Sequence, residues 1–68
     1  MSYGVGAKVE TIGGEYYLGR WIRPLETGVV IGRHISPGGQ EVYDVQLDED
    51  GKKYTFAPSE IEEVEEAP

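Results

Sequence analysis

The stretch that decides the fold is EVYDVQLDEDGKKYTFA, residues 41–57. Apolar and polar residues alternate in it twice, over residues 41–47 and again over residues 52–57. A period of two is typical of a β-strand that buries one face. The segment DEDG between the two strands, residues 48–51, predicts a tight hairpin turn whose Asp-Gly pair tolerates positive φ. The residues predicted to face the core from this hairpin are Tyr43, Val45, Leu47, Tyr54 and Phe56.

The same pattern continues on the N-terminal side of this hairpin. Residues 7–12 and residues 28–35 hold β-branched residues between glycine-containing turns, and each is predicted to form a strand. Gly32 lies inside the second of these strands, where a glycine often marks a bulge. The segment SPGG, residues 36–39, predicts a type II turn, with proline at its second position and Gly38 at its third.

Two further segments complete the predicted domain. Residues 15–27 are rich in aromatic and arginine residues and contain a proline, which discourages a helix, so a structured loop or an irregular hairpin is expected. Ser59 and Glu62 fit a capping box, which predicts a single helical turn. A short last strand is predicted near residues 62–65, and the acidic residues 65–68 are expected to fray.

Composition and charge limit the classes of protein that fit. The 68 residues are predicted to form one domain, residues 1–68, and the absence of cysteine excludes disulfides and zinc–thiolate sites. Small secreted domains usually carry disulfides, so a cytoplasmic location is expected, with no signal peptide and no membrane span. The net charge of −7 is concentrated in residues 35–68, which carry −8, against +1 in residues 1–34. Nucleic acid and anionic membranes are therefore unfavoured partners.

Several stretches resemble the sequence patterns of SH3-like barrels. VGAKV at residues 5–9 resembles their VGxxV opening, and GVVIG at residues 28–32 resembles the second strand of KOW and Tudor-like barrels. YDVQLD at residues 43–48, followed by YTFA and SEI, resembles their C-terminal part. The resemblance implies an all-β, five-stranded, partly open SH3-like barrel with a single helical turn before the last strand. Small uncharacterised bacterial and phage-encoded SH3-like proteins are similar, and the fold alone implies no one function.

Residues 15–25 carry the clearest signal of an interaction surface, because aromatic and arginine side chains are enriched at binding hot spots. Neighbours in an extended chain face opposite sides, so Tyr16 and Tyr17 are not both expected in the core. Trp21 and Ile22 should diverge in the same way. One interpretation is that these side chains only close one end of the barrel. The other is a non-enzymatic interaction or accessory module that binds a protein partner through Tyr16, Tyr17, Arg20, Trp21 and Arg23.

Two alternative functions follow from the charged residues. A KOW-like nucleic-acid-binding domain would use a basic face made of Lys8, Arg20, Arg23 and Arg33. An acidic inhibitor that mimics nucleic acid would instead use the carboxylates.

The sequence predicts neither catalysis nor a metal site. His34 is the single histidine, and no serine is placed to form a triad with it. The DEDG turn is too short for a calcium-binding loop, and no cofactor is expected. A sheet edge near the termini is compatible with a monomer or a weak homodimer.

Overall fold

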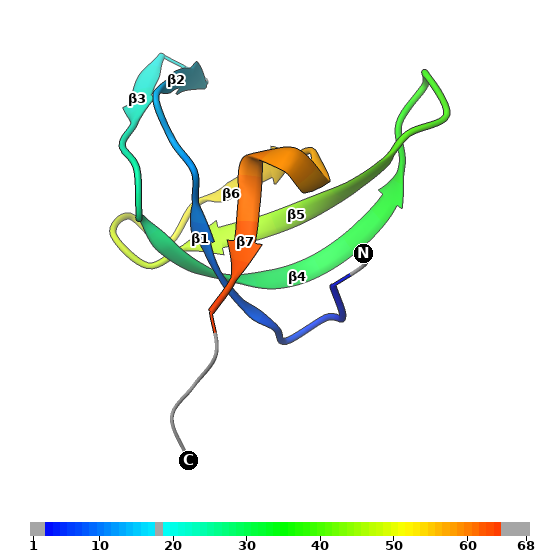
Figure 1. Ribbon diagram of the computed structural model, residues 1–68, viewed down its shortest axis with the longest axis horizontal. Coiled ribbons are helices and arrows are strands. Elements are labelled where there is room, and N and C mark those ends of the chain that lie inside the picture. The colour runs from blue at the N-terminus through cyan, green and yellow to red at the C-terminus, as the bar shows by residue number, and fades with distance from the viewer. Residues whose placement is uncertain (1–2, 18, 65–68) are drawn as a thin grey trace.

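Short strands joined by tight turns make up residues 3–17 and 19–64, the part of the chain that the structure, a computed structural model, describes (Figure 1). The elements are β1 (Lys8–Thr11), β2 (Glu15–Tyr17), β3 (Arg20–Ile22), β4 (Thr27–Ile35), β5 (Glu41–Leu47), β6 (Lys53–Phe56), the 3₁₀ turn η1 (Pro58–Glu60) and β7 (Ile61–Glu63). The predicted all-β class is confirmed, and each strand predicted outside the 15–27 segment is found, β5 with the predicted ends and the others with slightly different ones.

The strands form two antiparallel units. Five of them make one sheet in the order β6-β5-β4-β1-β7, while β2 and β3 pair as a separate hairpin (Figure 1). Within the described residues no ladder joins β6 to β7, so the sheet is not closed into a barrel. The described residues also contain no helix long and apolar enough to cross a bilayer.

The core forms where the alternating strands bury their apolar face. Tyr43, Val45 and Leu47 on β5 are buried, as are Tyr54 and Phe56 on β6, so the predicted core face of the central hairpin is confirmed. Removing these side chains from water is the main force that holds such a sheet in register. Further buried apolar residues come from the other elements: Tyr3, Val9, Ile22, Val30 and Ile61.

The predicted bulge in β4 is confirmed. Val30 pairs with Val45, whereas the next aligned pair is Gly32 with Asp44, so Ile31 is the extra residue. Nearby, Gly28 allows a close approach between strands, because a Cβ at Gly28 would lie 2.6 Å from the backbone oxygen of Gln46. The bulge and this close approach increase the local curvature of β4, which lies between β1 and β5 in the sheet.

The two predicted tight turns differ from expectation in detail. In the 36–39 turn the positive φ, +84°, falls at Gly39 and not at Gly38, so the type II assignment is wrong. Gly39 N–H donates to the oxygen of Ser36, and a left-handed glycine placed after such a turn restores the strand ladder. In the 48–51 turn only Gly51 has positive φ, because a wider loop closes through Gly51 N–H and the oxygen of Leu47.

The predicted capping box at Ser59 and Glu62 is also wrong. The N-cap is Ala57, two residues before Ser59, and the 3₁₀ turn begins at Pro58, since proline has no N–H to satisfy and has a fixed φ. The carboxylate of Glu60 accepts the backbone N–H of Ala57 at 2.7 Å, while Glu62 lies on β7. β7 accordingly starts before the strand predicted near residues 62–65. The expected fraying of residues 65–68 falls outside the described residues.

Candidate interaction surface

The 15–27 segment contains the hairpin β2–β3, whose register decides which side chains face outward. Tyr16 pairs with Trp21, and Tyr17 pairs with Arg20. Because side chains alternate along a strand, Tyr16 and Trp21 share the outer face and Tyr17 and Arg20 share the inner one. Of the five predicted contact residues, Tyr16 and Trp21 therefore face outward, whereas Tyr17 and Arg20 face the sheet.

Tyr16 and Trp21 form an exposed aromatic pair. Their ring centroids lie 5.1 Å apart with an interplanar angle of 64°, an edge-to-face arrangement. Tyr16 is 76% exposed and Trp21 is 47% exposed, whereas Ile22 is fully buried. The expected divergence of Trp21 and Ile22 is thus confirmed. Edge-to-face packing fixes both rings in a stable mutual orientation while leaving much of their surface in water.

Tyr17 anchors the hairpin to the sheet. Its ring packs edge-to-face on Tyr54, with centroids 5.3 Å apart, and tilts against Phe56. Its hydroxyl accepts the backbone N–H of Thr55 at 3.0 Å. β6 is the last strand of the sheet order, so this hydroxyl occupies a backbone donor on the open edge. Tyr17 is thus placed as a support for the hairpin.

The base of the hairpin is fixed through β1. The hydroxyl of Thr11, which is buried, donates to the oxygen of Arg23 at 2.7 Å and accepts the N–H of Glu26 at 3.0 Å. Gly13, with φ +86°, lets the chain pass so close that a Cβ there would lie 2.2 Å from the nitrogen of Pro24. The chain before the hairpin is therefore held against residues 23–26 that follow it, by the Thr11 hydroxyl and by the close approach of Gly13 to Pro24.

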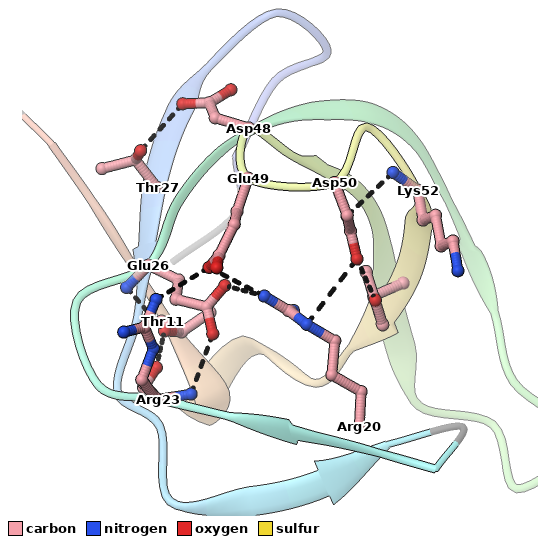
Figure 2. Close-up of polar contacts among 10 residues, drawn as sticks. Thr11, Arg20, Arg23, Glu26, Thr27, Asp48, Glu49, Asp50 and Lys52 are labelled. Atoms are coloured by element: carbon pink, nitrogen blue, oxygen red, sulfur yellow. Dashed lines mark hydrogen bonds and ion pairs between the residues drawn. The ribbon is translucent and has the colours of Figure 1, made fainter.

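Arg20 lies on the inner face, within a cluster of carboxylates (Figure 2). Its Nη2 donates to Glu26 at 2.7 Å and to Glu49 at 2.9 Å, and its Nε lies 3.7 Å from Asp50. The guanidinium carbon also lies 5.6 Å from the centroid of the Tyr54 ring. Arg20 therefore joins the hairpin to the turn between β5 and β6.

The charges of this cluster are fixed by their hydrogen bonds. Burial raises the pKa of Glu26, but bonds from Arg20 and from the backbone N–H of Arg23 outweigh burial, so that pKa lies below its usual range. Bonds from the Tyr54 hydroxyl and the Lys52 N–H hold the pKa of Asp50 below its usual range. Both carboxyls are therefore ionised at neutral pH.

Arg23 lies at the border between the hairpin and a cleft. Its Nη2 donates to Glu49 at 2.8 Å, and Figure 2 shows Glu49 held between Arg23 and Arg20. The cleft has a volume of about 510 Å³ and lies between residues 23–27 and the start of the β5–β6 turn, at Asp48 and Glu49. Across it, the hydroxyl of Thr27 donates to Asp48 at 2.8 Å.

Leu25 stands at this cleft with its side chain 67% exposed. Its φ is +62°, the left-handed region, which a non-glycine residue adopts at a cost of about 1–2 kcal/mol. The backbone is held there because Leu25 N–H donates to the oxygen of Thr11 at 2.8 Å. An apolar side chain is thus presented to solvent beside Arg23.

The four residues of the predicted basic face lie in different places. Arg20 and Arg23 come together, but both bind Glu49. Arg33 lies near the opposite end of β4 and its Nη1 is 3.7 Å from Glu41, while Lys8 is on β1 opposite Val29. The structure therefore gathers two of these four residues, around a carboxylate.

A carboxyl pair ties the hairpin to η1. The carboxyl of Glu15 hydrogen-bonds that of Glu60, which raises the pKa of Glu15 to about 7, with smaller contributions from burial and from the charge of Glu60. Glu60 is the residue whose carboxylate also accepts the N–H of Ala57. Below about pH 7 the carboxyl of Glu15 is therefore protonated.

The sequence pattern does not single out the acidic residues that position this surface. It indicates only solvated charges or turn residues at Glu26, Glu49 and Asp50, and it places Leu25 at the end of the 15–25 segment without assigning it a contact. A local signal exists for Glu26 only, because it follows Arg23 by three residues, close enough for its carboxylate to accept the Arg23 N–H. Glu49 contacts residues 26 and 29 positions away, and no local pattern reports such contacts.

No protein-family model, curated protein or solved structure matches the chain. The described residues also contain no group of three or more His, Asp or Glu side chains arranged to hold a metal ion.

Proposed function

We propose that the chain is a non-enzymatic interaction domain of the SH3-like barrel class. The order β6-β5-β4-β1-β7 supports the fold, since β4, β5 and β6 follow one another through hairpin turns and β1 lies between β4 and β7. The long excursion between β1 and β4 and the 3₁₀ turn between β6 and β7 are further features that the resemblance implies. Buried side chains from every strand except β2 fill one shared core, as a partly open barrel requires.

The proposed activity is binding of a protein partner by the outer face of β2–β3, through Tyr16, Trp21 and the adjacent Arg23. The observation that carries it is the exposed edge-to-face aromatic pair on a hairpin held by Thr11, Tyr17 and Arg20. A pre-organised aromatic surface loses little entropy on binding, so its buried area converts efficiently into affinity.

Comparative capture from an extract of the source cells tests this proposal. The immobilised wild-type domain is expected to retain a protein that Trp21→Ala and Tyr16→Ala both lose. The matched control is Ile35→Ala, which shortens another exposed apolar side chain at the far end of β4. A single hot-spot truncation should weaken binding by at least about 2 kcal/mol, or about thirtyfold.

Thermal unfolding of each variant separates loss of binding from loss of folding. Cross-strand aromatic pairs contribute about 0.2–1 kcal/mol to a sheet, so Trp21→Ala should stay folded at room temperature. The proposal fails if folded Trp21→Ala captures the same proteins as wild type. It also fails if Ile35→Ala loses them equally.

A further inference from the structure

The outer hairpin face does not end at Trp21. Arg23, two residues later, both borders this face and lines the cleft, and Leu25 exposes its side chain at the same place. We propose that the outer hairpin face and the neighbouring cleft together bind an extended basic segment of the partner, which places an apolar side chain against Trp21 and Leu25 and a lysine or arginine in the cleft. This inference rests on the proposed function of the hairpin.

Charge decides the chemistry of the segment. The cleft and the cluster beneath it hold Glu26, Asp48, Glu49 and Asp50 against Arg20, Arg23 and the nearby Lys52, an excess of one negative charge. Asp48 is exposed, and Thr27 donates to one of its carboxylate oxygens. A cationic side chain entering here would meet the exposed carboxylate of Asp48, whereas an acidic one would be repelled.

The charge of the whole chain points the same way and argues against a second copy as the occupant. A net charge of −7 on 68 residues opposes the association of two copies. The same field attracts a basic segment from a distance and raises the rate of encounter. A heterologous basic partner therefore fits this surface better than self-association does.

Selection from a random peptide library displayed on phage tests the inference, because the surface itself then chooses among many peptide chemistries. Peptides retained by the wild-type domain are expected to be enriched in lysine or arginine next to an aliphatic or aromatic residue. Binding of a synthetic consensus peptide can then be followed by the fluorescence of Trp21, the single tryptophan of the chain.

Three variants test separately the charge at the cleft, the overall charge and the apolar side chain of Leu25. Asp48→Asn keeps an oxygen for Thr27 but removes the charge. It should lower the affinity for the peptide about twofold to fivefold, the range for an exposed ion pair. Glu63→Gln removes one negative charge from β7 instead and should lower the affinity for the peptide less than Asp48→Asn does. Leu25→Asn tolerates the left-handed backbone and removes the apolar side chain, so it should fold and bind weakly.

The outcomes separate this inference from the proposed function. Selection of neutral or acidic peptides whose binding still requires Trp21 would overturn the proposal of a basic segment and would leave the proposed interaction surface supported. Equal weakening by Asp48→Asn and Glu63→Gln would also overturn it, since only the overall charge would then act. A library that yields no peptide, or peptides indifferent to Trp21→Ala, would overturn both.

Discussion

Two adjacent glycines at the base of the hairpin have nearly the same backbone angle and very different surroundings. Gly13 has φ +86° and Gly14 has φ +80°, so alanine is strained at either position. A Cβ at Gly13 would meet the backbone of Pro24 and Arg23, while a Cβ at Gly14 would have nothing within 4 Å. The pair thus separates the effect of conformation from the effect of packing.

Gly13→Ala should destabilise the domain more than Gly14→Ala. Both variants lose about 1–2 kcal/mol from the left-handed backbone. Gly13→Ala should lose a further 1–3 kcal/mol, approximately, because the chain must move apart from Pro24. Urea unfolding of both variants measures the difference. Equal midpoints would show that the contact between Gly13 and Pro24 does not constrain the hairpin.

The carboxyl of Glu15 should make stability depend on pH. Its pKa rises from 4.5 in the unfolded chain to about 7 in the fold, so the folded state holds the proton more tightly. The stabilisation is complete below pH 4.5 and is lost as pH rises through about 7. Thermal unfolding of wild type should therefore show a falling melting temperature from about pH 5 to about pH 8, relative to Glu15→Gln.

The comparison with Glu15→Gln removes the contributions of titrating groups that do not interact with Glu15. Wild type and variant should differ most in slope between about pH 5 and about pH 7.5. Parallel curves across this range would mean that the fold does not raise the pKa of Glu15.

At the scale of elements, the hairpin β2–β3 is held by side chains from strands that are distant in sequence. Tyr17 reaches β6, Arg20 reaches the β5–β6 turn, and Thr11 joins both ends of the segment. The hairpin strands have only three residues each, too few for stability on their own. Its position therefore depends on these tertiary contacts.

Glu26→Gln should loosen the hairpin more than Glu49→Gln. Glu26 is buried and bonds both Arg20 and the backbone of Arg23, whereas Glu49 is half exposed. Weakening a buried bond to a charged group costs about 1.5–3 kcal/mol, and exposed ion pairs contribute much less. Chemical unfolding gives the two free energies. A larger loss in Glu49→Gln would place the anchor in the β5–β6 turn instead.

The strands are predictable from sequence and the hairpin contacts are not, for a physical reason. Alternation in residues 41–57 reports directly which side chains leave water, so β5, β6 and their core face follow from it. The turn geometry at Gly39 and the cap at Glu60 depend on single hydrogen bonds that several residues are able to make. The contacts of Arg20 join positions 6 and 29 residues apart, and local patterns contain no such information.

At the scale of the whole molecule, charge separates the candidate functions. Arg20 and Arg23, half of the predicted basic face, already bind carboxylates, and the chain carries −7 overall. Phosphate binding would have to break these pairs against an opposing field.

Titration with single-stranded DNA at low salt should leave the Trp21 fluorescence and the amide resonances of Arg20, Arg23 and Arg33 unchanged. The physical reason is that the carboxylates already paired with two of these arginines repel the incoming phosphates. The same titration at higher salt serves as the control. Resonance shifts that disappear as salt rises would restore the KOW-like nucleic-acid alternative.

The hydrogen bond to the Tyr17 hydroxyl also affects how readily the protein aggregates. Because this hydroxyl accepts the Thr55 N–H, that donor on the outer edge of β6 is not available to pair with a further strand. Opening the hairpin therefore uncovers a template for intermolecular pairing while the sheet behind it is still intact. Damage to the hairpin should thus lead to aggregates of nearly native molecules before it leads to unfolded chains.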